Sequence, residues 1–163
     1  VSAFKKIKKN SYKPVLFVKR NGLNYDQSLG RAWESSEFKN DIIFTGCVES
    51  RVLPDLYRGA KAFIFPSSYE GFGLPILESF INETPVIITR DASLPEVGGE
   101  AVFYLENSPH RDLELAEIMN QISEGGDLIK KKTALGVERL SLFSWSKMAL
   151  ETLKVYEELR QTK

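Results

Sequence analysis

The sequence predicts a doubly wound α/β fold, in which helices cover both faces of a parallel sheet. Short runs of consecutive apolar residues alternate along the chain with longer segments of helical periodicity. Apolar residues at consecutive positions, rather than alternate ones, indicate strands that are buried on both faces, as in a parallel sheet. Repeated strand–helix units of this kind are typical of doubly wound sheets.

Each element of this fold is expected from a local pattern. The candidate strands are the apolar runs at residues 15–18, 42–44, 62–65, 86–88 and 102–104. The candidate helices lie at residues 26–38, 52–58, 74–81, 112–123, 128–142 and 146–159. Ser144 is the expected N-cap of the last helix. Trp145 and Tyr156 are expected to anchor that helix in the core, because large aromatic residues at helical spacing are usually buried.

The composition is that of one globular domain over residues 1–163. Hydrophobic residues make up 42% of the chain and charged residues 27%, and 22 basic residues balance 22 acidic ones. This balance provides no overall field that would attract nucleic acid, and the lysine run at 130–132 is expected on a solvated helix face. Cys47 is the single cysteine, which excludes a disulfide framework, and no apolar run approaches the ~20 residues that span a bilayer. We therefore expect a cytoplasmic protein.

The loops that follow the strands are where a ligand is expected, because ligands of open α/β sheets bind beyond the carboxyl ends of the strands. These are the loops after Phe44, Phe65 and Ile88. The middle loop reads FPSSYEGFGLPILESF over residues 65–80 and starts a helix through a Gly-Phe-Gly turn. Glycines there allow the backbone to approach a bound group, while the free amides and the dipole of the helix favour an anion such as a diphosphate.

Two glutamates flank the glycines of this loop. Glu70 precedes them, and Glu78 lies one turn after the start of the helix. A carboxylate can accept hydrogen bonds from two hydroxyl groups at once, which suits a sugar ring at Glu70 and a ribose at Glu78. The alternative is that a glutamate in an early helical turn only complements the helix dipole. Spacing alone leaves both interpretations open.

Three segments of the chain together resemble a known family. They read FTGCVESRVLPDLYRGAKAFIFPSSYEGFGLPILESF, TPVIITRDASLPEVGGEAVFYL and FSWSKMALETLKVYEEL. The pair Glu70 and Glu78, with seven residues between them, matches the signature of that family. The chain resembles the C-terminal, donor-binding domain of the GT-B-fold glycosyltransferases of group 1, also called family 4. The resemblance implies a Rossmann-like sheet that forms the C-terminal half of a GT-B fold.

The resemblance also implies an activity, which is the retaining transfer of a hexose from a nucleoside diphosphate sugar to a sugar or lipid acceptor. Glu70 would be the catalytic residue, binding hydroxyls of the donor sugar, and Glu78 would bind the nucleotide ribose. Backbone groups would contact the donor at the other positions: Gly46, Val48, Gly71, Phe72, Gly73 and Leu74. Family members generally need no metal and no cofactor, and the single histidine and single cysteine provide no ligand cluster that argues otherwise.

Two parts of the family enzyme are not found in the sequence. The family domain begins with a strand and a loop that precede the helix at residues 1–9, and this loop supplies an arginine and a lysine to the donor phosphates. The missing first strand is expected in the middle of the sheet, between the strands at 15–18 and 62–65. The chain is therefore expected to be a fragment of a longer two-domain enzyme and to be inactive alone. The resemblance implies that the N-terminal domain binds the acceptor and that the terminal helix packs toward it, which would leave part of the apolar stripe of that helix exposed in this chain. Peripheral membrane association of the full-length enzyme stays open. Lys19 and Arg20 are expected as solvated charges.

Two other functions stay open beside transfer. Glu70 and Glu78 could be the paired carboxylates of a glycosidase, which would need them roughly 5 to 9.5 Å apart across a sugar cleft, although the glycine-rich start of the helix favours phosphate. A non-catalytic module that binds nucleotide sugars or regulates an enzyme fits the fragment almost as well. Among the other conspicuous residues, Cys47 is interpreted as a packed small residue rather than a nucleophile. His110, just before a helix, is expected to be exposed.

Overall fold

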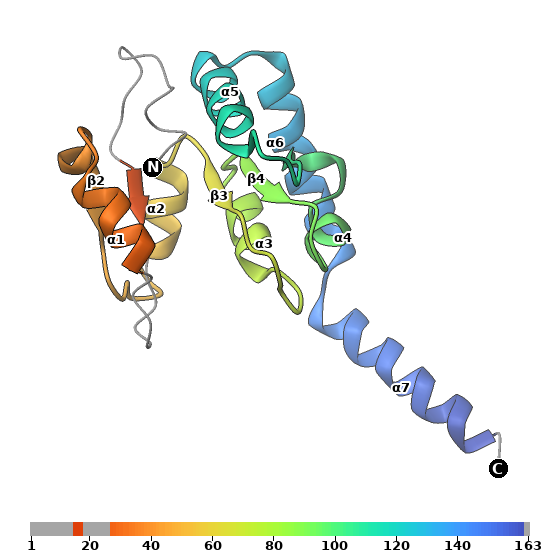
Figure 1. Cartoon of the computed structure of the whole chain (residues 1–163). Helices are drawn as coiled ribbons and strands as arrows, with labels where there is room; N and C mark the ends of the chain where they lie inside the picture. Colours follow the sequence, from red (N-terminus) through yellow and green to blue (C-terminus); the bar gives the residue numbers. More distant parts are fainter. Residues whose placement is uncertain (1–14, 18–26, 162–163) are drawn as a thin grey trace.

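A computed structural model describes residues 15–17 and 27–161 of the chain (Figure 1). Its strands are β1 (Val15–Phe17), β2 (Ile42–Phe44), β3 (Phe63–Phe65), β4 (Val86–Thr89) and β5 (Phe103–Leu105). Its helices are α1 (Gln27–Glu34), α2 (Leu53–Gly59), α3 (Leu74–Ile81), α4 (Leu94–Gly98), α5 (Arg111–Glu124), α6 (Asp127–Arg139) and α7 (Trp145–Gln161), with short 3-10 helices η3 (Lys39–Asp41), η4 (Gly99–Ala101) and η5 (Leu140–Leu142). The predicted strands and the predicted helices from residue 26 onward are confirmed, with ends that differ by a few residues. The helix expected at residues 1–9, together with Lys19 and Arg20, lies outside the described residues.

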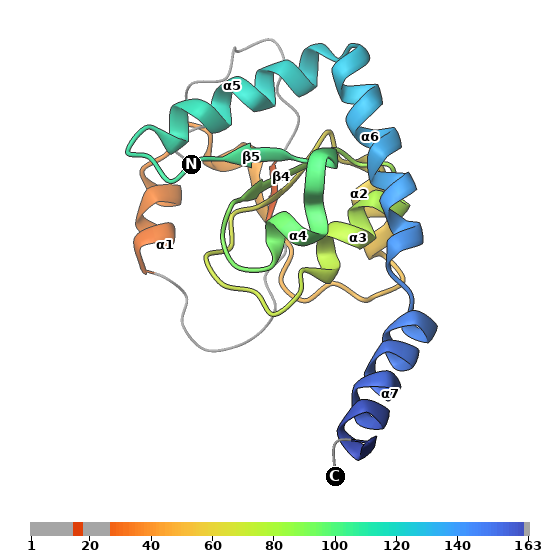
Figure 2. The ribbon, with the colours of Figure 1, turned by 90° about the vertical axis from the view of Figure 1, so that its right-hand side faces the viewer.

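The strand pairs in the described residues are all parallel, as predicted, but they form two separate sheets. β1 pairs with β2, with Leu16 opposite Ile43, and β3, β4 and β5 pair in that order, with Ile64 opposite Ile87. The division falls between β1 and β3, where the resemblance predicts a further strand. Helices α3 and α5 lie on opposite faces of the three-stranded sheet (Figure 2), which is the predicted layered α/β arrangement.

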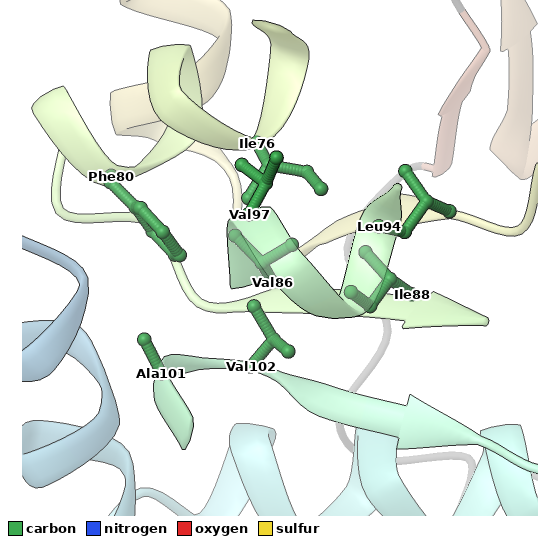
Figure 3. Packing of buried hydrophobic residues seen from close by; sticks show 8 residues of the cluster. All are labelled: Ile76, Phe80, Val86, Ile88, Leu94, Val97, Ala101 and Val102. Atoms are coloured by element: carbon green, nitrogen blue, oxygen red, sulfur yellow. The ribbon is translucent and has the colours of Figure 1, made fainter. Parts of the chain in front are cut away.

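β4 is the centre of the three-stranded sheet, and all four of its residues are buried. Because side chains alternate along a strand, Val86 and Ile88 face one layer and Ile87 faces the other. The first layer, drawn in Figure 3, joins β4 to α3, α4, η4 and the residue before β5 through Ile76, Phe80, Val86, Ile88, Leu94, Val97, Ala101 and Val102. The second layer joins β4 to β5 and α5 through Ile87, Phe103, Leu105 and Ile122. Burial on both faces explains why this strand is apolar at consecutive positions.

Helix α6 holds the connection between β4 and β5 through two basic side chains. Arg139 donates from Nε to the carbonyl of Val97 at 3.0 Å and from Nη2 to the carbonyl of Glu96 at 2.6 Å, near the C-terminus of α4. Lys132 donates from Nζ to two carbonyls in and just after η4, at 3.0 and 2.8 Å. The expectation of a solvated lysine face is therefore wrong for Lys132, which is half-buried and whose pKa is lowered by burial. Both cations satisfy carbonyl groups that the ends of short helices leave without partners.

Helix α7 extends away from the rest of the molecule (Figures 1 and 2). It begins as predicted, because the amide of Lys147 donates to Oγ of Ser144 at 3.1 Å, which makes Ser144 the N-cap. The expectation that Trp145 and Tyr156 lie in the core is wrong, since they are 77% and 63% exposed. An apolar stripe on a helix is buried only where another element covers it, and every residue of α7 up to Arg160 is exposed in the described structure. None of the helices within residues 27–161 combines the length and the apolarity needed to cross a membrane.

Candidate functional site

The loop between β3 and α3 carries most of the predicted site. It lies at the edge of the sheets where the parallel strands end, and the loops after β2 and β4 lie at the same edge (Figures 1 and 2). Three loops from separate parts of the chain therefore form the edge at which a ligand is expected. The last residue of β4, Thr89, and Ser93 in the loop that follows both make hydrogen bonds to the loop between β3 and α3, which we call the glycine-rich loop.

Helix α3 starts with a backbone that glycine adopts more readily than any other residue. Gly73 is the N-cap, with φ +104° and ψ 41° in the left-handed region, and it is buried. A Cβ atom at this position would lie 3.2 Å from both Ile76 Cδ1 and Leu94 Cδ2. Pro75 stands in the first turn, as predicted, where its missing amide hydrogen is not needed. The N-cap has no side chain, so the first amides and the positive end of α3 point into the loop without a side-chain cap.

Glu70 is half-buried, and residues of its own loop and of the loop after β4 hold it. Ser67 donates from Oγ to Oε1 of Glu70 at 2.9 Å. Thr89, at the end of β4, donates from Oγ1 to the carbonyl of Ser67 at 2.6 Å. Oγ of Ser93 lies 3.0 Å from the carbonyl oxygens of both Glu70 and Phe72. Glu70 thus lies three residues before the N-cap of α3, on a loop that neighbouring hydroxyl groups hold in place.

Glu78 lies further along α3, where it is exposed and contacts α2. The hydroxyl of Tyr57 donates to Oε2 of Glu78 at 3.0 Å. Burial is the largest cause that raises the pKa of Tyr57, and the hydrogen bond to Glu78 raises it further. The pKa therefore lies well above its ordinary value of 10.0. The tyrosine therefore stays protonated at neutral pH and remains a hydrogen-bond donor. The two glutamates have separate hydroxyl partners, one within the glycine-rich loop and one on a neighbouring helix.

The ring of Phe72 contacts the segment that precedes α7. It meets the ring of Phe143 edge-on, with centroids 5.7 Å apart and planes at 86°. Phe143 follows η5 and precedes α7. Edge-on aromatic pairs are stabilising, so this contact helps to hold the loop. The role predicted for Phe72 is that of its backbone amide, which does not require the ring.

The remaining predicted positions are spread over two elements. Gly46 and Val48 lie on the loop after β2, where Gly46 has φ +66°, a left-handed value that favours glycine, and Val48 is half-buried. Leu74, the first residue of α3, is 51% exposed. The interpretation of Cys47 as a packed residue is wrong, because Cys47 is exposed on the loop after β2. His110 is exposed, as predicted, at the N-cap position of α5.

Four residues with hydroxyl groups contact the site but had no role assigned from the sequence: Ser67, Thr89, Ser93 and Tyr57. The first three lie in or beside the loops after Phe65 and Ile88, which the sheet topology marks as ligand loops, so their position was a usable signal. Tyr57 lies on α2, outside these loops, and only the tertiary fold brings it to Glu78. Across the part of the chain that the structure describes, no group of three or more His, Cys, Asp or Glu side chains could hold a metal ion.

The fold and the loop define an α/β protein of the class that receives ligands at the carboxyl edge of a parallel sheet. The family to which this chain belongs follows from a match to a known family. Residues 1–136 match the family described as glycosyl transferases group 1. The chain belongs to this family, which confirms the resemblance predicted from its motifs.

Curated relatives of the chain include mannosyltransferases. O-antigen chain mannosyltransferase B of Escherichia coli is 36% identical over 118 residues, which cover 72% of this chain and 30% of that protein. The MMP alpha-(1->4)-mannosyltransferase of Mycolicibacterium hassiacum is 30% identical over 122 residues, which cover 73% of this chain and 30% of that protein. The chain therefore spans less than a third of the length of these relatives.

Solved structures of glycosyltransferases share the fold. A glycosyltransferase from Rickettsia africae superposes with a TM-score of 0.77 at 23% identity, covering 99% of this chain and 44% of that chain. The pneumococcal O-GlcNAc transferase GtfA, solved in complex with UDP and GlcNAc, superposes with a TM-score of 0.69 at 18% identity, covering 88% of this chain and 29% of that chain. These similarities confirm the predicted fold class, a Rossmann-like half of a GT-B glycosyltransferase.

Proposed function

We propose that this chain is the donor-binding part of a retaining glycosyltransferase, which transfers a hexose from a nucleoside diphosphate sugar to a sugar or lipid acceptor. The observation that carries the proposal is that Glu70, held by Ser67, lies three residues before the N-cap of α3, which has no side-chain cap, in a chain of the group 1 family. A nucleotide sugar requires a group that binds sugar hydroxyls and a group that binds a diphosphate. A carboxylate supplies the first, and the free amides of a helix N-terminus supply the second.

Each group has a separate task in this proposal. The diphosphate binds at the positive end of α3, near the amides of Gly73 and Leu74, and Glu70 accepts hydrogen bonds from the sugar. Glu78 accepts hydrogen bonds from the ribose, with the hydroxyl of Tyr57 beside it. The bond between the anomeric carbon and the diphosphate breaks while the acceptor hydroxyl attacks the same face and gives its proton to the departing diphosphate, so the anomeric configuration is retained. The start of α3 stabilises the charge of the departing diphosphate. The loop after β2 frames the base, and no metal is needed.

The relatives indicate which donor to test first. Two of them are named mannosyltransferases, one of an O-antigen chain, so we propose a mannose donor and a role in polysaccharide synthesis. The GtfA structure contains UDP, which makes uridine nucleotides the second set. A cytoplasmic location belongs to the same proposal, because a chain with a single cysteine is suited to a reducing compartment.

Ligand-observed NMR titration of the protein with GDP, UDP, ADP and their mannose or glucose conjugates tests this function. One nucleotide is expected to bind saturably, and Glu78→Ala is expected to weaken that binding because it removes the ribose acceptor. The matching sugar conjugate is expected to bind more tightly than the nucleotide, an advantage that Glu70→Ala removes. Glu117→Ala, an exposed carboxylate of α5 on the opposite face of the sheet, serves as the matched control. If none of these ligands binds, the titration is repeated with a form of the protein extended toward the N-terminus, because the arginine and lysine that the resemblance predicts at the donor phosphates are not found in this sequence. Lack of binding by the extended form, or equal binding by Glu78→Ala, would sink the donor-site assignment.

A further inference from the structure

The glycine-rich loop is tied to the buried end of β4. Thr89 is 1% exposed, and its Oγ1 donates to the carbonyl of Ser67 at 2.6 Å. Oγ of Ser67 lies 2.9 Å from Oε1 of Glu70 and 3.2 Å from the carbonyl of Tyr69. A hydroxyl has one proton to donate, and the carboxylate is both the nearer and the stronger acceptor. Two hydrogen bonds therefore connect the buried strand end to the carboxylate of Glu70.

Ser93 restrains the backbone of the same loop. Its Oγ lies 3.0 Å from the carbonyl oxygens of Glu70 and Phe72, which stand on either side of Gly71. A Cβ atom on Gly71 would meet nothing within 4 Å, so packing does little to restrict the backbone at this residue. The hydrogen bonds of Ser93 supply a restraint that packing does not.

We propose that Ser67, Thr89 and Ser93 are positioning residues that hold Glu70 in the orientation that the donor sugar requires. This inference rests on the proposed function, in which Glu70 accepts hydrogen bonds from sugar hydroxyls. The hydrogen bond from Ser67 to Oε1 restricts rotation of the carboxylate, and in this proposal Oε2 is the oxygen that receives the sugar. A carboxylate that is already ordered loses less conformational freedom when the donor binds, so positioning strengthens affinity for the sugar.

A positioning role and a merely structural role have different consequences. Loss of structure would weaken the binding of every ligand at this edge of the sheet. Loss of positioning acts on the sugar alone, because the diphosphate and the ribose bind α3 rather than Glu70. The quantity that separates the two roles is the ratio of the Kd values for a nucleoside diphosphate and for its sugar conjugate.

The test is isothermal titration calorimetry of the intact protein with the pair of ligands that the NMR titration selects, GDP and GDP-mannose being the first pair. Thr89→Val removes the hydroxyl at nearly constant volume, and Thr89→Ser retains it. In Thr89→Val the affinity for GDP-mannose is expected to fall roughly three- to tenfold while that for GDP changes by less than about twofold. Thr89→Ser is expected to restore the ratio. Thr152→Val removes a comparable hydroxyl-to-carbonyl hydrogen bond of 2.8 Å on α7 and is expected to change neither Kd.

Ser67→Ala and Ser93→Ala extend the test to positions where a small exchange does not threaten the core. Each is expected to show the same selective loss of affinity for GDP-mannose. Equal weakening of both ligands, or no change for either, in these two variants would overturn the positioning role. A wild-type protein that binds GDP and GDP-mannose alike, or whose preference for GDP-mannose survives Glu70→Ala, would overturn the proposed function and the positioning role with it.

Discussion

Replacement of Gly73 by alanine probes the turn on which the candidate site depends. Gly73 is buried, has φ +104°, and stands where the glycine-rich loop becomes helix α3. A Cβ atom at this position would lie 3.2 Å from the ends of Ile76 and Leu94, which are both fully buried at 0% exposure. The substitution therefore imposes an unfavourable backbone conformation and crowds two core side chains at once.

These effects set the size of the expected change. A residue with a Cβ atom in the left-handed region costs about 1–2 kcal/mol relative to glycine, and the crowding of two core side chains costs on the order of 1 kcal/mol more. Alanine also restricts the unfolded chain, which offsets about 0.5 kcal/mol. We expect the free energy of unfolding to fall by about 2 kcal/mol. For a chain of this length, that corresponds to a fall in Tm of about 4–8 °C.

Differential scanning calorimetry of Gly73→Ala measures this change, and Gly71→Ala is the matched control two residues earlier. Gly71 has no left-handed backbone, and a Cβ atom there would meet nothing within 4 Å. The Tm of Gly71→Ala is expected to stay within about a degree or two of the wild-type value or to rise slightly. Equal destabilisation by the two substitutions would refute the reasoning, because it would show that neither the backbone angle nor the crowding decides the outcome.

Three further predictions follow from the packing of α6 and α2. A Cβ atom on Gly136 would lie 2.6 Å from the buried ring of Phe80. Urea titration of Gly136→Ala is therefore expected to show a loss of roughly 1 kcal/mol in the free energy of unfolding, although alanine has the better helix propensity. A more stable variant would show that the ring moves aside. Arg139→Met removes two charged donors to carbonyls of α4. The same titration is expected to show a loss of about 2 kcal/mol in the free energy of unfolding. An unchanged midpoint would contradict the stabilising role of these hydrogen bonds. The raised pKa of Tyr57 favours the protonated form in the folded protein, so its contribution to stability is complete below about pH 10 and is lost as the pH rises further. The free energy of unfolding measured against pH is expected to fall less steeply above pH 10 in Tyr57→Phe, and identical slopes would contradict the assignment.

Patterns that depend on neighbouring residues along the chain predicted the fold well. The strand at Val86–Thr89 is buried on both faces, as its consecutive apolar residues indicated, and Ser144 caps the helix that it precedes. The same local reasoning located the glycine-rich loop and the proline in the first turn of α3. Such features follow from side-chain periodicity and backbone preference, which can be determined from neighbouring residues in the sequence.

Features that depend on contacts between distant segments could not be predicted in this way. Tyr156 lies on an apolar stripe, but periodicity identifies an apolar face without identifying what covers it. The contact of Thr89 with Ser67 and that of Tyr57 with Glu78 each join residues more than twenty positions apart. The position of Ser67 and Thr89 beside the ligand loops was a signal, but the partners of Thr89 and Tyr57 are known only once the loops and helices are placed in space.

The hydrogen bonds from α6 to the segment between β4 and β5 affect how this chain can change over evolutionary time. Arg139 and Lys132 donate to main-chain carbonyls, which every amino acid possesses. The exposed side chains of Glu96 and Glu100 can therefore be replaced without removing an acceptor, whereas neither cation can be replaced without losing a donor. Sequence drift is therefore expected at these two exposed positions of the connector, and constraint is expected at Arg139 and Lys132 of α6. The path between β4 and β5 is thus specified by residues as many as 43 positions later in the chain.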